Sequence, residues 1–391
     1  AHVRMATEGD WTFRVEGWSD PWGTWRHNAL AKLPLGMDVL EEAGVLHIIE
    51  NEPFQLKNGI AFTYQNHYTA FDFRHKHGKG KNFALQVDRA RFDQILIHQA
   101  QQHGADVHFG ETVISMDNTA APVQLKIQQN SGIQYDLHAH FVLDASGYFR
   151  AVPRLLGWEI TQGITQHNVY HTQINDRITH PKFDRNKNLI AVHPEYRDIW
   201  MWLIPLDNQR SSVGLVGQSR YFKQAEDQAG RLLGASELLK KYFGEVPLFQ
   251  KIMPQAEWDN GFPFHYIPSY SADVQANHGN GFAILGNAAG FLDPVFSSGI
   301  SSAMYSAKLA VEVLTRQLNG EKVDWQSEYA SRQGYGAQVF KTSIDNWYNG
   351  SLQDWVFNPS HSPESREMLC AVLAGYAWDS SNPYVRDAQL A

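Results

Sequence analysis

The chain has 391 residues, of which 43% are hydrophobic, 13% aromatic and 19% charged, and its formal net charge at pH 7 is −8. These values are typical of a globular protein with a large core in one or two domains, and they exclude a low-complexity chain. The acidic balance, with no long block of Lys and Arg, argues against nucleic acid as the main partner.

Cysteine usage and hydropathy add expectations about the compartment. Cys370 is the only cysteine, so an intramolecular disulfide cannot form, and this suits a reducing compartment. No apolar run approaches the roughly 18 residues that a membrane span needs, and no secretory signal is visible among the first residues. We therefore expect a cytoplasmic protein without a membrane span, and we predict no metal site.

The predicted elements alternate between helices and strands along the chain. A helix pattern begins at Leu35 and stops at Gly44, and residues 59 to 73 alternate as strands do. A second helix is predicted over 86 to 103. Residues 123 to 139 form a predicted hairpin around Asn-Ser-Gly, and the chain then continues into an apolar strand.

The second half of the chain repeats this mixture. Residues 165 to 217 are rich in strand patterns, and a helix is predicted over 234 to 243. An apolar helical stripe runs from Ala303 to Leu318, and residues 325 to 376 look mostly helical. Two strand–turn–helix elements far apart in the sequence predict an α/β fold, with one discontinuous nucleotide-binding domain and an inserted strand-rich domain.

The predicted domain boundaries follow from this order. The nucleotide-binding domain comprises residues 35–56, 84–151 and 277–320, and the substrate domain comprises residues 57–83 and 152–276. Residues 321–391 form a C-terminal helical region, and residues 1–34 form an atypical N-terminal segment.

A loop of small residues is the most informative local feature. It follows the apolar run 282 to 285 and precedes the helical stripe, so a strand, a turn and a helix N-terminus are predicted there. Free backbone N–H groups and the helix dipole make such a place suitable for an anion or a cofactor. An ordinary glycine-rich loop is the alternative. The loop reads Gly286-Asn287-Ala288-Ala289-Gly290-Phe291-Leu292-Asp293-Pro294-Val295-Phe296-Ser297-Ser298-Gly299-Ile300.

Two shorter motifs are individually weak. The run from Asp144 to Gly147 ends a predicted strand in a small-residue turn, and such turns are common in proteins without a ligand. Arg89 lies near the start of a predicted helix, where a solvated charge pair is the alternative to a ligand contact.

Two further motifs carry aromatic and basic chemistry. The run from Trp200 to Pro205 reads Trp-Met-Trp-Leu-Ile-Pro, and in a strand Trp200 and Trp202 share one face. Aromatic packing on a sheet is the alternative. Lys57 stands just before a strand lined with Phe and Tyr. A lone lysine is usually a surface residue, but desolvation would lower its pKa and make the amine reactive.

Together these motifs resemble those of flavin-dependent halogenases. The hexapeptide that begins at Trp200 matches the family pattern Trp-x-Trp-x-Ile-Pro, and the loop contains Phe-x-x-Pro-x-x-Ser-x-Gly. The segment around Lys57 resembles the lysine segment of the family. The resemblance runs from about Leu35 to Tyr384, nearly the whole chain.

The resemblance implies a fold and a cofactor. The nucleotide-binding domain would be an FAD-binding domain of the glutathione-reductase or hydroxybenzoate-hydroxylase type. FAD would act as FADH2, supplied by a separate flavin reductase. The family's usual Gly-Asp is Gly-Asn here, and Asn still accepts a hydrogen bond. The residues implied near FAD are Arg89, Asp144, Gly147, Gly286, Asn287, Ala288, Gly290 and Pro294.

The resemblance also implies an activity and roles for particular residues. Chloride or bromide held by the backbone at Ser298 and Gly299 would be oxidised, with O2 and reduced flavin, to hypohalous acid. The hypohalous acid would pass to Lys57 and halogenate an electron-rich ring in natural product biosynthesis. Trp200 and Trp202 would keep the organic substrate away from the flavin.

One position bears on the substrate. Phe296 stands where tryptophan halogenases carry a glutamate that assists deprotonation of indole, and a phenylalanine cannot do this. A phenol or pyrrole, free or tethered to a carrier protein, is therefore the expected substrate. The sequence does not single out a general base among 18 histidines.

The resemblance ends at the N-terminus, where Gly17 and Gly23 do not have the spacing of Gly-x-Gly-x-x-Gly. That motif would hold the pyrophosphate of FAD at a helix N-terminus. A natural variant, a rearranged chain and a missing stretch of sequence each explain this. The functional alternatives are a related FAD-dependent aromatic hydroxylase or prenyl reductase, and a cofactor-poor homologue that binds an aromatic ligand without catalysis.

Overall fold

The computed structural model describes residues 36–160, 167–268, 271–291 and 293–387. The predicted N-terminal segment lies outside the described residues. Helices and strands intermix along the chain, and two parallel strands are each followed by a turn and a helix, so the predicted α/β class is confirmed. The exact domain boundaries stay a prediction.

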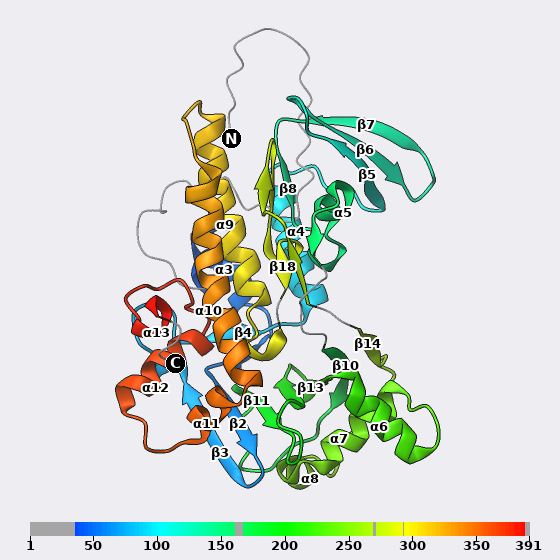
Figure 1. The fold of residues 1–391 in the computed structure, drawn as a ribbon, viewed down its shortest axis with the longest axis vertical. Coiled ribbons are helices and arrows are strands. Elements are labelled where there is room, and N and C mark those ends of the chain that lie inside the picture. Colours follow the sequence, from blue (N-terminus) through cyan, green and yellow to red (C-terminus); the bar gives the residue numbers. More distant parts are fainter. Residues whose placement is uncertain (1–35, 161–166, 269–270, 292, 388–391) are drawn as a thin grey trace.

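A seven-stranded sheet forms the lower half of the molecule (Figure 1). It joins two segments that are far apart in the sequence, and all neighbours are antiparallel except β2 and β11. In sheet order the strands are β14 (His265–Ile267), β10 (Asn168–Asn175), β13 (Arg210–Gly217), β12 (Trp200–Pro205), β11 (Lys187–Val192), β2 (Gly59–Tyr64) and β3 (His67–Asp72).

Side-chain alternation gives this sheet two buried faces. On one face Leu189, Met201 and Leu215 pack with the three helices that follow β13. These helices are α6 (Ser219–Ala229), α7 (Ala235–Glu245) and α8 (Pro247–Ile252). The opposite face carries Phe62 and Trp200, and we call it the tryptophan face. It contacts the C-terminal helices α10 (Ser331–Tyr348), α11 (Ser351–Phe357) and α12 (Pro363–Leu373).

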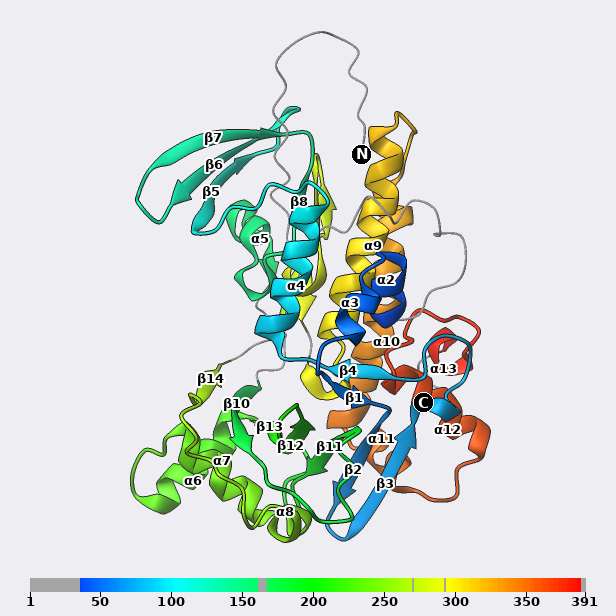
Figure 2. The same cartoon turned by 180° about the vertical axis from the view of Figure 1, so that it is seen from behind.

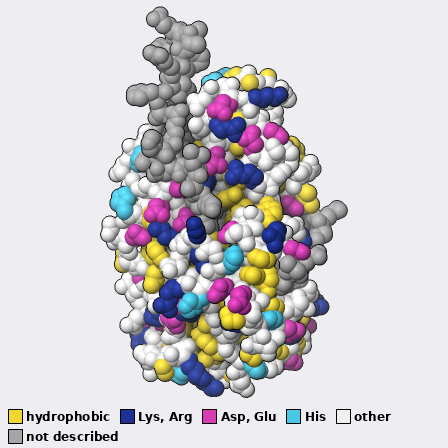
Figure 3. All heavy atoms as spheres, turned by 90° about the vertical axis from the view of Figure 1, so that its left-hand side faces the viewer, with side chains coloured by type: hydrophobic (Ala, Val, Ile, Leu, Met, Phe, Trp, Pro, Cys, Tyr) yellow, Lys and Arg dark blue, Asp and Glu magenta, His cyan; other side chains and the backbone are white. Residues whose placement is uncertain are grey.

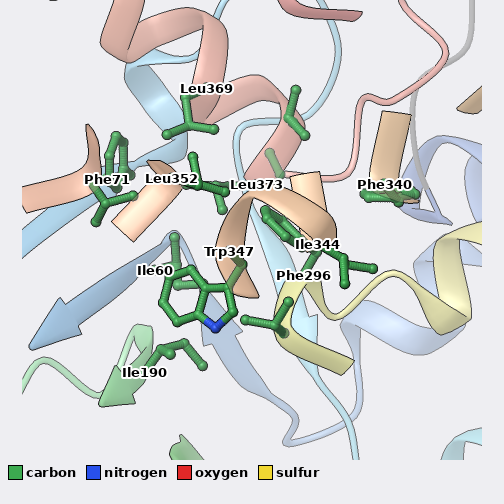
Figure 4. Close-up of a cluster of buried hydrophobic side chains, with 14 of the residues drawn as sticks. Ile60, Phe71, Ile190, Phe296, Phe340, Ile344, Trp347, Leu352, Leu369 and Leu373 are labelled. Atoms are coloured by element: carbon green, nitrogen blue, oxygen red, sulfur yellow. The ribbon is translucent and has the colours of Figure 1, made fainter. Parts of the chain in front are cut away.

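The cluster on the tryptophan face joins remote parts of the chain. Figure 4 shows the Trp347 indole beside Ile60 and Ile190 of the sheet, and Ile344 and Phe296 belong to the same cluster. Leu369 of α12 closes the cluster from the far side of α11. The short helix α13 (Pro383–Arg386) and the 3-10 turn η1 (Phe73–His75) also supply buried side chains.

The upper half contains the two strand–turn–helix elements. β8 (Val142–Asp144) pairs in parallel with β17 (Phe282–Ile284), which also pairs with β16 (His278–Gly279). Among the described residues, only β17 is hydrogen-bonded to β8. A second sheet consists of β5 (Glu111–Asp117), β6 (Val123–Gln129) and β7 (Gln134–Ala139).

Helices surround these strands. α9 (Gly299–Leu318) is the long helix after the loop, and Figure 2 shows α2 (Gly36–Glu42) and α3 (Leu46–Glu50) beside it. The remaining helices of this half are α4 (Arg89–Gln102) and α5 (Ala151–Leu156). Two small sheets complete it: β1 (Gln55–Lys57) with β4 (Ala84–Gln86), and β15 (Ala272–Val274) between β18 (Gly290–Phe291) and β9 (Glu159–Ile160).

One predicted helix boundary was wrong. The helix predicted from residue 86 begins at Arg89, because Ala84–Gln86 pairs with β1 as a strand. The Asp88 carboxylate accepts hydrogen bonds from the N–H groups of Ala90 and Arg91, which is the geometry of a helix N-cap. The predicted hairpin at 123 to 139 is confirmed as β6 and β7.

The surface is mixed in charge where Figure 3 shows it. Lys and Arg side chains lie among Asp and Glu side chains, and hydrophobic side chains form a band between them. This face therefore lacks the single-sign field that nucleic-acid binding requires. In the described part of the chain, no helix is long and apolar enough to cross a membrane.

The cluster on the tryptophan face should hold much of the stability. Leu369→Ala removes a side chain that is 1% exposed and leaves a cavity, so we expect the free energy of unfolding to fall by about 2–5 kcal/mol. Urea denaturation measures this change. Leu318→Ala, in which the removed side chain is 65% exposed, should change it by less than about 0.5 kcal/mol. Equal losses in the two variants would contradict a core between sheet and helices.

Candidate active site

Lys57 is buried, and no described residue is its counter-ion. It ends β1, its side chain is 9% exposed, and its Nζ lies 5.8 Å from the ring centroid of Phe73. No ion pair joins it to another described residue, and burial lowers its pKa to about 8. Lys187 is equally buried, but its Nζ donates to Asp184 at 2.7 Å and to Asn58 at 2.9 Å. The Lys57 amine therefore loses its proton more readily than an exposed lysine does.

The two tryptophans of the motif lie on β12 and share the tryptophan face. Their ring centroids are 5.8 Å apart, and the Trp202 indole N–H donates to the Ser212 hydroxyl at 3.1 Å. Gly214 lies across from Trp202 on β13, and a Cβ added there would overlap the indole ring. The glycine therefore lets Trp202 lie flat on the sheet.

Phe296 faces the same cluster from the loop. It ends the 3-10 turn η4 (Pro294–Phe296), it is buried, and its ring centroid lies 6.4 Å from that of Phe340 on α10 (Figure 4). It packs in the cluster that contains Trp200 and Phe73. One apolar region is thus bordered by β12, by the loop and by Phe73, whose ring faces the Lys57 amine.

The loop itself is shaped by glycines and by an unusual serine. Gly286 opens the 3-10 turn η3 (Gly286–Ala288) with φ of +51°, and an added Cβ would lie 2.9 Å from Ala303 Cβ on α9. Gly290 lies in β18, where it meets the backbone of Ala272. Ser297 has φ of +53°, a strained conformation for a residue with a Cβ.

The loop ends at the N-terminus of α9. Ser298 is the N-cap of this 20-residue helix, and its side chain makes no capping hydrogen bond. Gly299 is the first helical residue, and a Cβ built there would lie 3.8 Å from the Asn287 side-chain amide and 4.0 Å from Phe291. First-turn N–H groups, an amide and an aromatic edge therefore meet around a position without a side chain. Backbone N–H groups at such a position can approach a ligand closely, so we call it the cradle.

Asp144 shapes the first turn. Its two carboxylate oxygens accept from the N–H groups of Ser146 at 2.9 Å and Val152 at 2.8 Å, so it ties β8 to α5. Gly147 begins the 3-10 turn η2 (Gly147–Phe149) with φ of +59° and open space around its Cα. A cofactor would approach this turn at the backbone of Gly147 and not at the Asp144 carboxylate.

Arg89 forms a solvated charge pair, which is the alternative to a ligand contact. Its guanidinium is largely exposed and forms a bidentate pair with Asp93 one turn along α4, at 2.9 and 3.0 Å. Its contact with a flavin stays a prediction.

Three polar residues of the site were not predicted. The Trp200 indole N–H donates to the Tyr348 hydroxyl at 2.9 Å, and that hydroxyl donates to Asp293 at 2.7 Å. The His167 ring stacks on Tyr348 with centroids 4.1 Å apart. Burial lowers the pKa of His167 to about 4, so its imidazole is neutral near pH 7.

A weak signal for one of these residues existed in the sequence. In an extended strand His167, Val169 and His171 share a face, and strand pairing places His171 across from Gly214 on the tryptophan face. No comparable signal existed for Tyr348, because nothing along a helix indicates which strand it will contact.

The described residues fit one side of a flavin. The cradle at Asn287 and Gly299 and the open turn at Gly147 suit the ring and the adjoining ribityl chain, because backbone N–H groups can approach closely there. The described residues provide no further strand beside β8 for a pyrophosphate. The fit that the described residues show is therefore to the flavin ring and the adjoining ribityl chain.

One protein-family model matches the part of the chain that contains the candidate site. Residues 55–351 match the model described as tryptophan halogenase, which is most of the chain. Residues 1–51 match a second model, the N/S domain of an alpha-1,4-glucan:maltose-1-phosphate maltosyltransferase. The described end of this second stretch, α2 and α3, nevertheless packs with Phe92 and Met304 of the main body.

Known proteins that are similar to this chain include halogenases. A 1H-pyrrole-2-carbonyl-[peptidyl-carrier protein] chlorinase of Pseudomonas fluorescens is 25% identical over 82% of this chain and 74% of its own length. A tryptophan 2-halogenase of Chondromyces crocatus is 26% identical over 72% of this chain, which covers 53% of that protein. The crystal structure of a flavoprotein/dehydrogenase from Cytophaga hutchinsonii has a TM-score of 0.83 at 30% identity, over 90% of this chain and 84% of that one.

The buried amine should make stability depend on pH. Because the pKa of Lys57 falls from 10.5 unfolded to about 8 folded, the unfolded chain binds more protons between these values, and stability rises with pH there. Lys57→Met should raise the unfolding free energy at pH 7 by up to about 3 kcal/mol, and this gain should shrink toward pH 10. Urea denaturation at both pH values measures it. Lys187→Met should give no such gain, and a pH-independent gain for Lys57→Met would contradict the lowered pKa.

The flat seat of Trp202 should depend on Gly214. Gly214→Ala should lower the unfolding free energy by about 1–3 kcal/mol and displace the indole, as seen by urea denaturation and near-UV circular dichroism. Gly244→Ala is the matched control, because Gly244 lies in α7 with open space around it and alanine favours a helix. A Gly214→Ala variant as stable as the control would show that Trp202 does not need this glycine.

Proposed function

Because the chain belongs to the tryptophan halogenase family, we propose that it is a flavin-dependent halogenase that transfers halogen from a halide to an electron-rich aromatic ring. The observation that carries this proposal is Lys57, a buried lysine without a described counter-ion beside the apolar region that Trp200 and Phe296 border. Such a lysine has no structural ion pair to explain its burial, and desolvation leaves its amine reactive near neutral pH.

The loop at 286–299 is the proposed cofactor and halide site. Gly147, Gly286, Asn287, Ala288, Gly290 and Pro294 would border the flavin. Backbone N–H groups at Ser298 and Gly299 would hold chloride or bromide, because the positive end of α9 attracts an anion. A bound reduced flavin would give two electrons to O2, and the halide would give two more and become hypohalous acid.

Side chains on the tryptophan face would separate the flavin from the substrate. Trp200 is fully buried and Trp202 lies flat over Gly214, so together they fill the region between the loop and the sheet with indole rings. A small neutral molecule such as hypohalous acid needs less space than an aromatic substrate. The Lys57 amine would then hold the hypohalous acid and direct it at the ring.

Phe296 favours a phenol or pyrrole as substrate. Its ring is buried against Phe340 and offers no base, whereas a carboxylate would be required to assist an indole. The similarity to a chlorinase of carrier-bound pyrrole supports this choice. A separate flavin reductase and a cytoplasmic location stay predictions.

Direct assay of halogenation tests the proposal. The protein is supplied with FAD, a flavin reductase, NADH and bromide, and mass spectrometry of phenol and pyrrole panels should show brominated product. Lys57→Met should lower product formation by at least about 100-fold while flavin reoxidation continues, since loss of a catalytic group typically costs this much. Lys240→Met, a change of an exposed lysine in α7, should leave activity unchanged.

Two outcomes would overturn it. An oxygenated product in place of a brominated one would identify an aromatic hydroxylase. No quenching of flavin fluorescence at high micromolar FAD would identify a homologue without cofactor.

A further inference from the structure

Tyr348 joins the two sequence motifs of the site. It is the last residue of α10, and it lies between Trp200 on β12 and Asp293 in the loop. Its hydroxyl accepts the indole N–H of Trp200 at 2.9 Å and donates to Oδ2 of Asp293 at 2.7 Å. One hydroxyl group therefore connects the tryptophan strand with the loop, although the two are about ninety residues apart.

Asp293 links the hydrogen bond of Tyr348 to the backbone conformation of the loop. It is 2% exposed, and its other oxygen, Oδ1, accepts the backbone N–H of Val295 at 2.9 Å, which caps η4. The capped turn leads directly into Ser297, whose positive φ redirects the chain into α9. The orientation of Asp293 thus sets where Ser298 and Gly299 present their N–H groups.

The surroundings make these hydrogen bonds strong. Trp200 is fully buried, and the Tyr348 ring is sandwiched in the apolar cluster with His167 stacked on it at 4.1 Å. In such a place an unpaired donor or carboxylate costs more than it would in water. A rotation of Trp200 or a shift of the loop would therefore leave a buried polar group unsatisfied.

We propose that Tyr348 is a positioning residue that holds the tryptophan barrier and the halide-binding loop in one fixed arrangement. This inference rests on the proposed function. It also explains how a buried carboxylate is tolerated five residues from an anion site. Tyr348 and Val295 donate to Asp293, so the negative charge is engaged by donors on α10 and in η4 and not directed at the N-terminus of α9.

The test is Tyr348→Phe, which removes the hydroxyl and keeps the ring. The KM for bromide should rise about tenfold, as expected for loss of one charge-assisted hydrogen bond, and the yield of brominated product per flavin oxidised should fall. Tyr376→Phe is the matched control, because its hydroxyl likewise makes a part-buried hydrogen bond, to the Lys81 carbonyl at 2.7 Å outside the site. It should leave both quantities unchanged.

A second measurement does not depend on activity. Hydrogen–deuterium exchange should become faster in peptides covering 293–299 and 199–205 in Tyr348→Phe, and unchanged there in Tyr376→Phe. Trp200→Phe, which removes the indole donor, should give a similar acceleration, and the double variant should exceed either single variant only slightly.

The outcomes separate the two proposals. Unchanged bromide KM, product yield and exchange in Tyr348→Phe would overturn the positioning role. A wild-type protein that makes no halogenated product, but whose 293–299 and 199–205 peptides exchange faster in Tyr348→Phe, would overturn the proposed function and leave the tether established.

Discussion

The parallel pairing of β2 with β11 is the constraint on which the site depends. It joins residues 59–64 to 187–192 in a fixed register, so Phe62 lies beside Ile190 and Ile190 beside Trp202. A slip of one residue would turn every one of these side chains to the opposite face. This pairing places the segment that follows Lys57 in the same sheet as the tryptophan motif.

Within this register, the apolar cluster limits which polar groups can be buried. The cluster buries Trp200 and Phe296 and leaves room for few polar atoms. Some of those that remain are paired across elements, as in the bonds from Trp200 to Tyr348 and from Tyr348 to Asp293. Lys57 lies beside this cluster, and no described carboxylate compensates its charge. Desolvation of such an amine favours its neutral, reactive form.

The described cofactor side of the molecule is formed by turns and a helix N-terminus. The loop, the N-terminus of α9 and the turn at Gly147 have the close backbone approach that a flavin ring requires. Within the described residues β8 pairs with β17 alone, and the family match of residues 1–51 differs from that of residues 55–351.

The sequence by itself determined the fold class, the two strand–turn–helix elements and the candidate residues, because local patterns and short motifs encode these directly. The alternation around Trp200 and the small residues from Gly286 onward are legible without any neighbour in space. The burial of Lys57 and the hydroxyl of Tyr348 between Trp200 and Asp293 were decided by tertiary structure alone. Desolvation and hydrogen bonding act between residues that are close in space, and no spacing along the chain specifies which remote side chain will supply the partner.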